Sequence, residues 1–423
     1  MTNKGFIIHA DGDAFFAACE VARRPDLRGK AVVVGEERGI ASAMTQEAKQ
    51  LGIHRCMPIF EIRKTFPEAV ILSSHFELYQ KYHDNFISSM KKHFLYVESY
   101  SIDECFAWIP EVSEKELLVR IQKIKQEVEL SLGITFSFGA ARTKTLAKIA
   151  SKLKKPDGCV ILTQTSEIEK VLKSTDIRAV WGIGYKTSER LENRGLQTAY
   201  DFITTLSLVE VRKHFSEPIA ETWQELSGVR VYTINTEFDD QKSIQATRAL
   251  LKATDSPEIL FSELSRNIEI ACRELRALDL YAGMIHVSYS YKLGMSRHKH
   301  KCGIRRQLPI YTQNTEVLLK VAFELAKTIY TPGYIYKSTG VALSDLKQGK
   351  SIQNDLFGAQ KREINVSDQW RCIDALNRKF GDFTVMYGSS LKSVSMRQEM
   401  ATLRNAKDTY IYGLPLPYMG EVF

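Results

Sequence analysis

HADGDAFFAACE, residues 9–20, is the stretch that decides how the N-terminal half of this chain folds. The apolar run at residues 6–10 leads into it and predicts a short buried strand that ends at Asp11. Residues 15–22 then predict a helix, so the acidic residues lie in the turn between a strand and a helix. A carboxylate at the end of a buried strand is held on rigid backbone, which makes Asp11 a candidate for chemistry.

A second acidic segment is YSIDECF, residues 100–106, near the middle of a hairpin predicted over residues 95–109. Adjacent carboxylates such as Asp103 and Glu104 repel one another unless a cation neutralises them. Two Mg²⁺ ions about 4 Å apart can hold the attacking and leaving oxygens of a phosphoryl transfer, and such ions bind carboxylate oxygens. We therefore predict that Asp11, Asp103 and Glu104 meet around divalent ions. The alternative is that they are exposed turn residues.

The rest of the chain predicts a multidomain α+β protein. Strands alternate with helices up to about residue 166, which is typical of a single α+β core. Residues 167–232 are predicted as nearly all helix, and the polar segment 233–242 as a linker. From Ser243 the pattern predicts a small β-α-β-β-α-β unit, and the last 75 or so residues are mixed in character.

Charge is distributed unevenly along the chain, whose formal net charge is +8. Residues 142–155 contain six Lys or Arg and no acid, and residues 292–306 again contain six with two His. A single basic cluster is usually only a solvated face. Two clusters of one sign in separate regions favour a polyanionic partner.

Composition excludes several other classes of protein. The seven cysteines lie far apart without a C-x-x-C pair, which argues against a disulfide framework and a structural zinc site. No apolar run approaches the roughly 20 residues of a membrane span, and the N-terminus does not resemble a signal peptide. The sequence therefore predicts a cytoplasmic protein without a membrane partner.

Four spaced motifs carry a resemblance to a known family. HADGDAFFAACE is followed by YSIDECF, by GAARTKTLAKIASKLKKPDG (139–158) and by VWGIGYKTSERLENRGL (180–196). In this order and spacing they resemble the Y-family (translesion) DNA polymerases, over residues 5 to 346. Within the family, the segments TKTLAK, QEAK and DALN look most similar to the catalytic subunit of bacterial DNA polymerase V.

The resemblance implies a right-hand fold with a little finger. The implied boundaries are palm 1–14 and 75–166, fingers 15–74, thumb 167–232, linker 233–242, little finger 243–346, and a C-terminal tail 347–423 with a clamp-binding motif. It also implies metal ligands from Asp11, Asp103 and Glu104, with the backbone carbonyl of Gly12, around two Mg²⁺ ions.

The resemblance implies a nucleotide site as well. Phe16 matches the aromatic steric gate that excludes a ribose 2′-OH, although a helical Phe is equally good core. The other nucleotide-binding matches are Phe15, Thr45, Lys49 and Lys148. Where the family often has Tyr-Glu-Ala-Arg, this chain has QEAK (46–49), so Lys49 lacks the bidentate fork of Arg. The triphosphate contact of Thr45 or Gln46 stays open at this point.

DNA and protein contacts follow from the same resemblance. Gly182, Gly184 and Lys186 match a helix-hairpin-helix, whose backbone N–H groups approach a phosphate. In the basic hairpin we expect sequence-independent phosphate contacts from Arg297, Lys299, Arg305 and Arg306. The segment 353–357, with Gln353, Leu356 and Phe357, resembles the peptide by which bacterial polymerases bind the sliding clamp.

These matches imply a magnesium-dependent, template-directed DNA polymerase that performs error-prone lesion bypass in an SOS-type damage response. Its partners would be primer–template DNA, dNTPs and the bacterial sliding clamp, and its location the nucleoid. Accessory subunits or a recombinase filament are further candidate partners. Two other hypotheses remain open at this point: a palm-type nucleotidyl cyclase, and a non-catalytic DNA-binding scaffold with the same fold.

Overall fold

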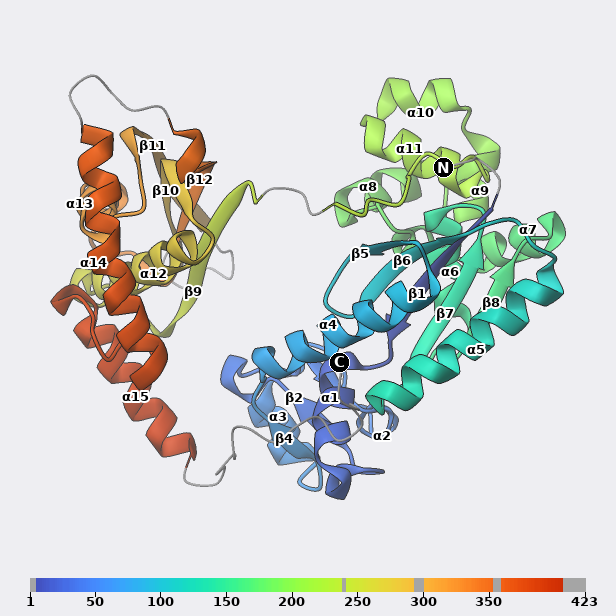
Figure 1. The fold of residues 1–423 in the computed structure, drawn as a ribbon, viewed down its shortest axis with the longest axis horizontal. Coiled ribbons are helices and arrows are strands. Elements are labelled where there is room, and N and C mark those ends of the chain that lie inside the picture. Colours follow the sequence, from blue (N-terminus) through green and yellow to red (C-terminus); the bar gives the residue numbers. More distant parts are fainter. Residues whose placement is uncertain (1–4, 238–240, 293–299, 353–358, 406–423) are drawn as a thin grey trace. The chain divides into compact units, whose positions relative to one another are not determined.

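The computed structural model describes residues 5–237, 241–292, 300–352 and 359–405 of the chain (Figure 1). The chain divides into two compact units, the first ending at residue 238 and the second beginning at residue 239. Within the described residues, no helix combines the length and apolar character that crossing a bilayer requires.

The first unit is built on a five-stranded sheet in the order β5-β6-β1-β7-β8. The strands are β1 (Phe6–Gly12), β5 (Tyr96–Ser99), β6 (Glu104–Ile109), β7 (Phe136–Ala141) and β8 (Cys159–Leu162). The central strand β1 runs antiparallel to both neighbours, and β8 is parallel to β7. The segment predicted as a hairpin therefore supplies β5 and β6, and the strand predicted first lies at the centre.

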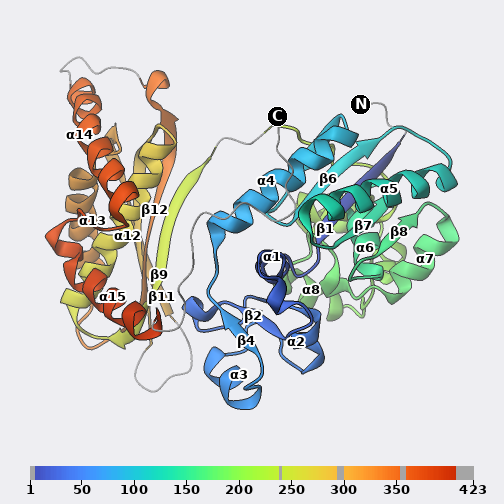
Figure 2. The same cartoon turned by 60° about the horizontal axis from the view of Figure 1, so that its bottom comes forward.

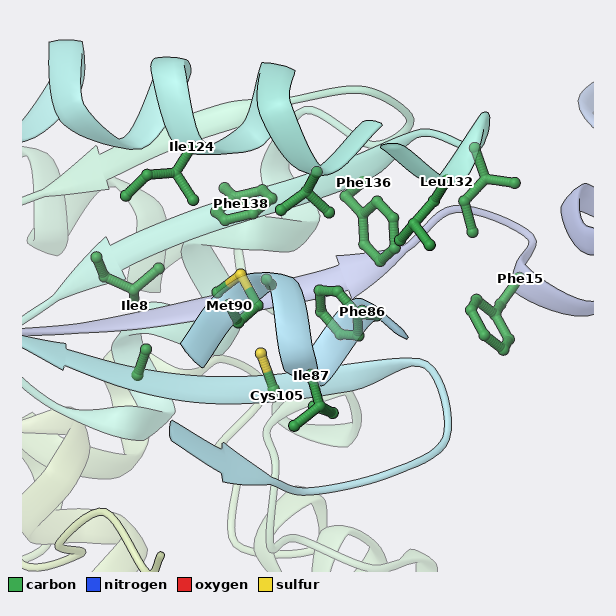
Figure 3. Close-up of a cluster of buried hydrophobic side chains, with 14 of the residues drawn as sticks. Ile8, Phe15, Phe86, Ile87, Met90, Cys105, Ile124, Leu132, Phe136 and Phe138 are labelled. Carbon is green, nitrogen blue, oxygen red and sulfur yellow. The ribbon is translucent and has the colours of Figure 1, made fainter. Parts of the chain in front are cut away.

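Helices cover both faces of this sheet. Successive side chains of β1 point to opposite faces, so both faces carry apolar side chains that need covering. Ile8 and Ala10 point into a core closed by α4 (Phe76–His93) and α5 (Glu114–Leu132). In Figure 3, Phe86 of α4 lies against Phe136, and their ring centroids are 4.5 Å apart. Ile7 points the other way, into a core closed by α6 (Lys144–Leu153). His9 and Asp11 share the face of Ile7.

A three-stranded sheet forms a separate small core in the same unit. Its order is β3 (Ala43–Met44), β2 (Val32–Val34), β4 (Val70–Leu72). Figure 2 shows β2 and β4 with three helices beside them, α1 (Phe15–Arg23), α2 (Gln46–Gln50) and α3 (Ile59–Thr65). The short 3-10 turns Pro25–Leu27 and Glu36–Arg38 complete this region.

The region predicted as nearly all helix is all helix and turn. It contains α7 (Thr165–Ser174), η3 (Ile177–Ala179), α8 (Tyr185–Glu192), α9 (Ala199–Thr205), α10 (Leu208–His214) and α11 (Glu217–Leu226). Thr198 and Ser207 form capping boxes at the starts of α9 and α10. The predicted linker begins later than expected, because Ile234 is buried and the Asn235 N–H donates to Glu98 at 2.6 Å.

The second unit has the predicted β-α-β-β-α-β order. The elements are β9 (Ser243–Thr254), α12 (Pro257–Ala277), β10 (Leu280–Lys292), β11 (His300–Thr312), α13 (Thr315–Ile329) and β12 (Ile335–Gln348). The antiparallel sheet has the order β11-β10-β12-β9. Ile285, Val287 and Leu343 point toward α12 and α13 and form the core of this unit.

Two further helices extend this unit beyond the predicted boundary at residue 346. After the turn η4 (Gly349–Ser351) come α14 (Ala359–Phe380), η5 (Gly388–Ser390) and α15 (Leu391–Asn405). Arg276 of α12 forms a buried ion pair with Asp374, at 2.6 Å, and Arg397 reaches Glu263 at 2.6 Å. The sequence pattern was hard to interpret here because much of this contact is made by ion pairs and serines. Of the predicted C-terminal tail, residues 359–405 therefore belong to the second unit.

A glycine allows α6 to pack directly on the first sheet. A Cβ built on Gly139 of β7 would lie 2.2 Å from both the carbonyl oxygen of Ala147 and the backbone nitrogen of Ser151. Real side-chain atoms do not approach backbone so closely, and backbone cannot rotate away. Gly139 therefore fixes the distance between the sheet and the helix that carries Lys148.

We predict that Gly139→Ala lowers the free energy of unfolding by about 1–3 kcal/mol or more, because α6 must shift away from β7. Urea denaturation followed by circular dichroism measures this change. The control is Gly184→Ala, where an added Cβ meets nothing within 4 Å and the expected change is below about 1 kcal/mol. Equal destabilisation by both changes would contradict the packing argument.

Candidate active site

The two strands place the acidic residues together at the end of β1. Asp11 and Glu104 are direct partners in the register of β1 and β6, so their side chains leave the sheet on the same face. The Gly12 N–H donates to the Asp103 carbonyl at 2.8 Å. Asp103, the residue before Glu104, therefore also lies at this end of β1. Ligand atoms of His9, Asp11 and Glu104 all lie within 4.8 Å of one another.

Glu104 is held by two hydrogen-bond donors. His9 Nε2 lies 2.8 Å from one carboxylate oxygen, and Lys148 Nζ lies 2.9 and 2.8 Å from the two oxygens. Burial opposes ionisation of Glu104, but the hydrogen bonds from His9 and Lys148 overcome it and lower the pKa to about 2. Glu104 is therefore a carboxylate at any physiological pH.

At Asp11, burial has a larger effect on the pKa than the neighbouring positive charge. Its side chain is 13% exposed, and burial raises its pKa although the ammonium group of Lys155 contacts it and favours the charged form. Lys155 was not among the residues that the sequence predicted. The available signal was its place in the turn Lys155-Pro156-Asp157-Gly158, directly after the basic helix.

His9 and Ser151 were also not predicted, and both support the site from behind. His9 is fully buried, with Nδ1 2.8 Å from the Ser151 hydroxyl and Nε2 on Glu104. Burial lowers the pKa of His9 despite the neighbouring Glu104. Both ring nitrogens are thus engaged with side chains, so in this structure His9 supports the Glu104 carboxylate and offers no free nitrogen.

The donor set fits a hard divalent cation. Asp11 and Glu104 offer carboxylate oxygens within 4.8 Å of each other, whereas the Asp103 carboxylate accepts a hydrogen bond from the Ser101 hydroxyl at 2.5 Å. Oxygen-only donors suit Mg²⁺ better than zinc, which prefers nitrogen and sulfur. In the structure, ammonium groups of Lys155 and Lys148 balance the charge of Asp11 and Glu104. A site that requires two cations beside its carboxylates is suited to bind metal.

Asp13 orients the turn that carries Lys155. Its side chain is buried and accepts hydrogen bonds from the Ser137 hydroxyl and the Asp157 N–H, each at 2.8 Å. Ser137 in turn pairs with Asp11 across β1 and β7. The second acid of the D-G-D sequence therefore organises structure, while the first faces the site.

A cavity of about 450 Å³ adjoins this turn. It is lined by Lys155, by Lys49 and Gln46 of α2, and by residues of α1 and of the segment 133–135. Thr45 also lines it, but its hydroxyl donates to the Lys30 carbonyl at 3.0 Å and accepts from the Val32 N–H at 3.1 Å. The Thr45 hydroxyl thus already has two backbone partners, one just before β2 and one at its first residue.

The two phenylalanines of α1 differ in environment. Phe15 is 3% exposed and belongs to the core of the first sheet, so only its backbone is free to contact a nucleotide. Phe16 is partly exposed and stacks on Tyr79 of α4, with ring centroids 4.4 Å apart and planes 14° from parallel. Of the two, Phe16 alone presents an aromatic edge to solvent.

The residues predicted to contact DNA also differ in their environments. Gly182 has φ 90°, and a Cβ there would meet the Thr222 hydroxyl at 2.6 Å, while Gly184 begins α8 with Lys186 exposed behind it. On β11, Arg305 pairs with His286 on the face away from α12 and α13. Arg306 instead pairs with core residue Ile285 and binds Glu324 of α13 at 2.6 Å. Outside the described residues lie Arg297, Lys299, Gln353, Leu356 and Phe357.

Comparison with known proteins identifies the family. Residues 10–152 match the impB/mucB/samB family, and residues 241–356 match the C-terminal domain of the same family. A DNA polymerase IV of Methanoculleus marisnigri is 30% identical over 367 residues, 83% of this chain and 97% of that protein. The chain belongs to the impB/mucB/samB family.

Two further similar proteins also match most of this chain. Protein UmuC of Salmonella typhimurium is 28% identical over 412 residues, 93% of this chain and 96% of that protein. A solved Y-family DNA polymerase chimera superposes with a TM-score of 0.69 at 23% identity and covers 81% of this chain and 99% of its own. That likeness supports the polymerase fold, and family membership removes the nucleotidyl cyclase from consideration.

Asp13 generates a test of this geometry. We predict that Asp13→Ala lowers the free energy of unfolding by about 1–3 kcal/mol, because the Ser137 hydroxyl and the Asp157 N–H lose their acceptor. Urea denaturation measures the change, and Asp26→Ala, which removes only an exposed acid paired with Arg24, is the control. An unchanged Asp13→Ala protein would show that the turn is held by other contacts.

Proposed function

We propose that this Y-family polymerase adds dNMPs from dNTPs to a primer 3′-OH, with release of pyrophosphate, at Asp11, Asp103 and Glu104. The observation that carries the proposal is the register of β1 and β6, which sets Asp11 opposite Glu104 with Asp103 next to it. Like charges directly opposite in a sheet are destabilising unless cations balance them. Lys148 and Lys155 balance them in the structure, and a pair of Mg²⁺ ions would do so when bound.

Bound magnesium would supply positive charge to the attacking 3′-oxygen and to the triphosphate. The chain's own residues prepare for it. His9 and Lys148 keep Glu104 ionised, and the Gly12 backbone is fixed by its bond to Asp103. Most of the rate enhancement then comes from positioning on rigid backbone. Lys148, matched by sequence to the triphosphate, binds Glu104 here, so holding that carboxylate is its first proposed role.

We assign the triphosphate contact chiefly to Lys155 and Lys49. They line one cavity of about 450 Å³ beside Asp13, and both are single cations without the fork of arginine. Two ammonium groups in one cavity suit the oxygens of a phosphate, although Asp13 and Glu47 also line it. Thr45 then holds the start of α2 in place, because its hydroxyl binds the backbone of Lys30 and Val32. Gln46 is exposed and is proposed to reach the nucleotide.

The second unit is proposed to bind the DNA duplex with the sheet face turned away from α12 and α13. By the pairing register this face carries small residues such as Ser288, Gly303 and Gly340, with Lys301 and Arg305 on β11. Small side chains allow close approach of a phosphate backbone, and the two cations attract it without reading sequence. Arg306, committed to Glu324, contributes less than the basic pattern suggested.

Gly182, Gly184 and Lys186 remain the proposed phosphate contact of the helical region, and Arg297 and Lys299 of the basic hairpin. We further propose a sliding clamp as partner of Gln353, Leu356 and Phe357, and lesion bypass in an SOS-type response at the nucleoid as the biological setting. Family membership and the UmuC relative support the bypass proposal. Accessory subunits and a recombinase filament stay candidate partners.

The metal proposal predicts that Asp103→Ala extends a primer at least about 1,000-fold more slowly, because several kcal/mol of charge stabilisation are lost. Gel-based primer extension, on plain and lesion-bearing templates and with or without Mg²⁺, measures this rate. Asp26→Ala, on the exposed surface, should extend normally. Normal elongation by Asp103→Ala would refute the assignment.

The sheet-face proposal predicts that Arg305→Ala weakens binding of primer–template DNA and reduces the slope of log affinity against log salt by about 1. Arg306→Ala, one residue away and on the other face, should leave the slope nearly unchanged. Fluorescence anisotropy titrations at several salt concentrations give both slopes. Equal slopes for the two variants would mean that the duplex does not use this face.

The clamp proposal predicts that Leu356→Ala combined with Phe357→Ala abolishes binding to a bacterial sliding clamp, since two apolar anchors are removed. Surface plasmon resonance on an immobilised clamp measures binding. Primer extension without clamp should be unaffected, which separates this contact from the active site. Unaltered clamp binding would locate the contact elsewhere.

A further inference from the structure

The partly exposed Phe16 is backed by a hydrogen-bonded network that none of the site chemistry uses. Phe16 and Glu20 are one turn apart on α1, and His75 and Tyr79 are one turn apart at the start of α4. Phe16 stacks on Tyr79 at 4.4 Å and meets Phe76 edge-on at 5.7 Å. The Tyr79 hydroxyl donates to Glu20 at 2.7 Å.

Glu20 is unusual as a structural residue. It is fully buried, and both His75 Nδ1 and the Tyr79 hydroxyl meet the same oxygen, Oε1, each at 2.7 Å. The other oxygen, Oε2, has no hydrogen-bond partner among the described residues. A buried carboxylate with one bare oxygen costs free energy that an apolar side chain would not. Its presence therefore calls for a role besides stabilising the fold.

The position of the network suggests that role. An aromatic ring excludes a 2′-OH by contact repulsion, which weakens steeply as the ring moves away. A ring that discriminates must therefore be held within about 0.5 Å by the residues behind it. Tyr79 lies flat against Phe16, and its hydroxyl bond to Glu20 prevents the Tyr79 ring from sliding.

We propose that Glu20 and Tyr79 are positioning residues that set sugar discrimination by fixing the Phe16 ring. The inference rests on the proposed role of Phe16 as the steric gate. It assigns to Glu20 and Tyr79 no contact with substrate. His75 contributes by holding the carboxylate of Glu20 against the first turn of α4, and the Glu20 hydrogen bond raises the pKa of His75, in keeping with that contact.

The test is single-nucleotide insertion opposite template dT, with kcat and KM measured separately for dATP and ATP. Tyr79→Phe removes only the hydroxyl, and Glu20→Gln keeps the size of the side chain while weakening the acceptor. Each should raise the ATP to dATP ratio of kcat/KM by about tenfold, the scale of one hydrogen bond to a charged group. The kcat/KM for dATP should change by less than about threefold, a small effect on this scale.

Phe16→Ala is measured alongside and should raise the ratio most. In the double variant Phe16→Ala with Tyr79→Phe, the second change should add nothing, because there is no ring left to position. The control is Tyr336→Phe, which removes a hydroxyl that accepts from the Thr331 N–H at 2.7 Å in the second unit. It should leave the ratio unchanged although it also removes a hydrogen bond.

The outcomes separate the two proposals. An unchanged ratio in Phe16→Ala removes the gate assignment itself. A raised ratio in Phe16→Ala with unchanged ratios in Tyr79→Phe and Glu20→Gln overturns the positioning role alone, as does an equal loss for both nucleotides or full additivity in the double variant. If thermal melting shows that Glu20→Gln does not fold, Tyr79→Phe decides the question.

Discussion

The first unit depends on one electrostatic constraint: two carboxylates stand opposite each other across an antiparallel strand pair. Asp11 and Glu104 are held on the same face of β1 and β6, where like charges oppose the fold. The surrounding structure compensates with cations and donors. Lys148 and His9 stabilise the charge of Glu104, and Lys155 contacts Asp11. Folding energy is thus spent to hold together a site that, in the proposed function, a divalent ion completes.

The compensating groups come from a short continuous piece of chain, α6 and the turn after it. Gly139 lets α6 lie directly on β7, so that Lys148 and Ser151 reach the buried ends of the strands. Asp13 then ties the following turn to β7 and places Lys155 beside Asp11. In the basic segment 142–155, Lys148 and Lys155 therefore contact the carboxylates of the site instead of facing only solvent or DNA.

The second unit shows how strand alternation divides a basic cluster. Arg305 and Arg306 are neighbours in sequence, yet they lie on opposite faces of the sheet because the side-chain period of a strand is two. One faces His286 on the face away from the helices, and the other binds Glu324. The helices α14 and α15 enlarge the same unit through ion pairs with α12, such as Arg276 with Asp374. Polar contacts of this kind leave little periodicity to detect.

What the sequence by itself determined is most of the elements up to β12 and the choice of candidate acids. Apolar periodicity located β1, α4 and the β-α-β-β-α-β order, and the motifs singled out Asp11, Asp103 and Glu104, because hydrophobic pattern and residue type are local properties. Tertiary structure alone decided which side chains support them. His9, Ser151, Lys155 and Glu20 act through partners 55 to 144 residues away, and such partners follow from strand register and helix packing, which no local pattern specifies.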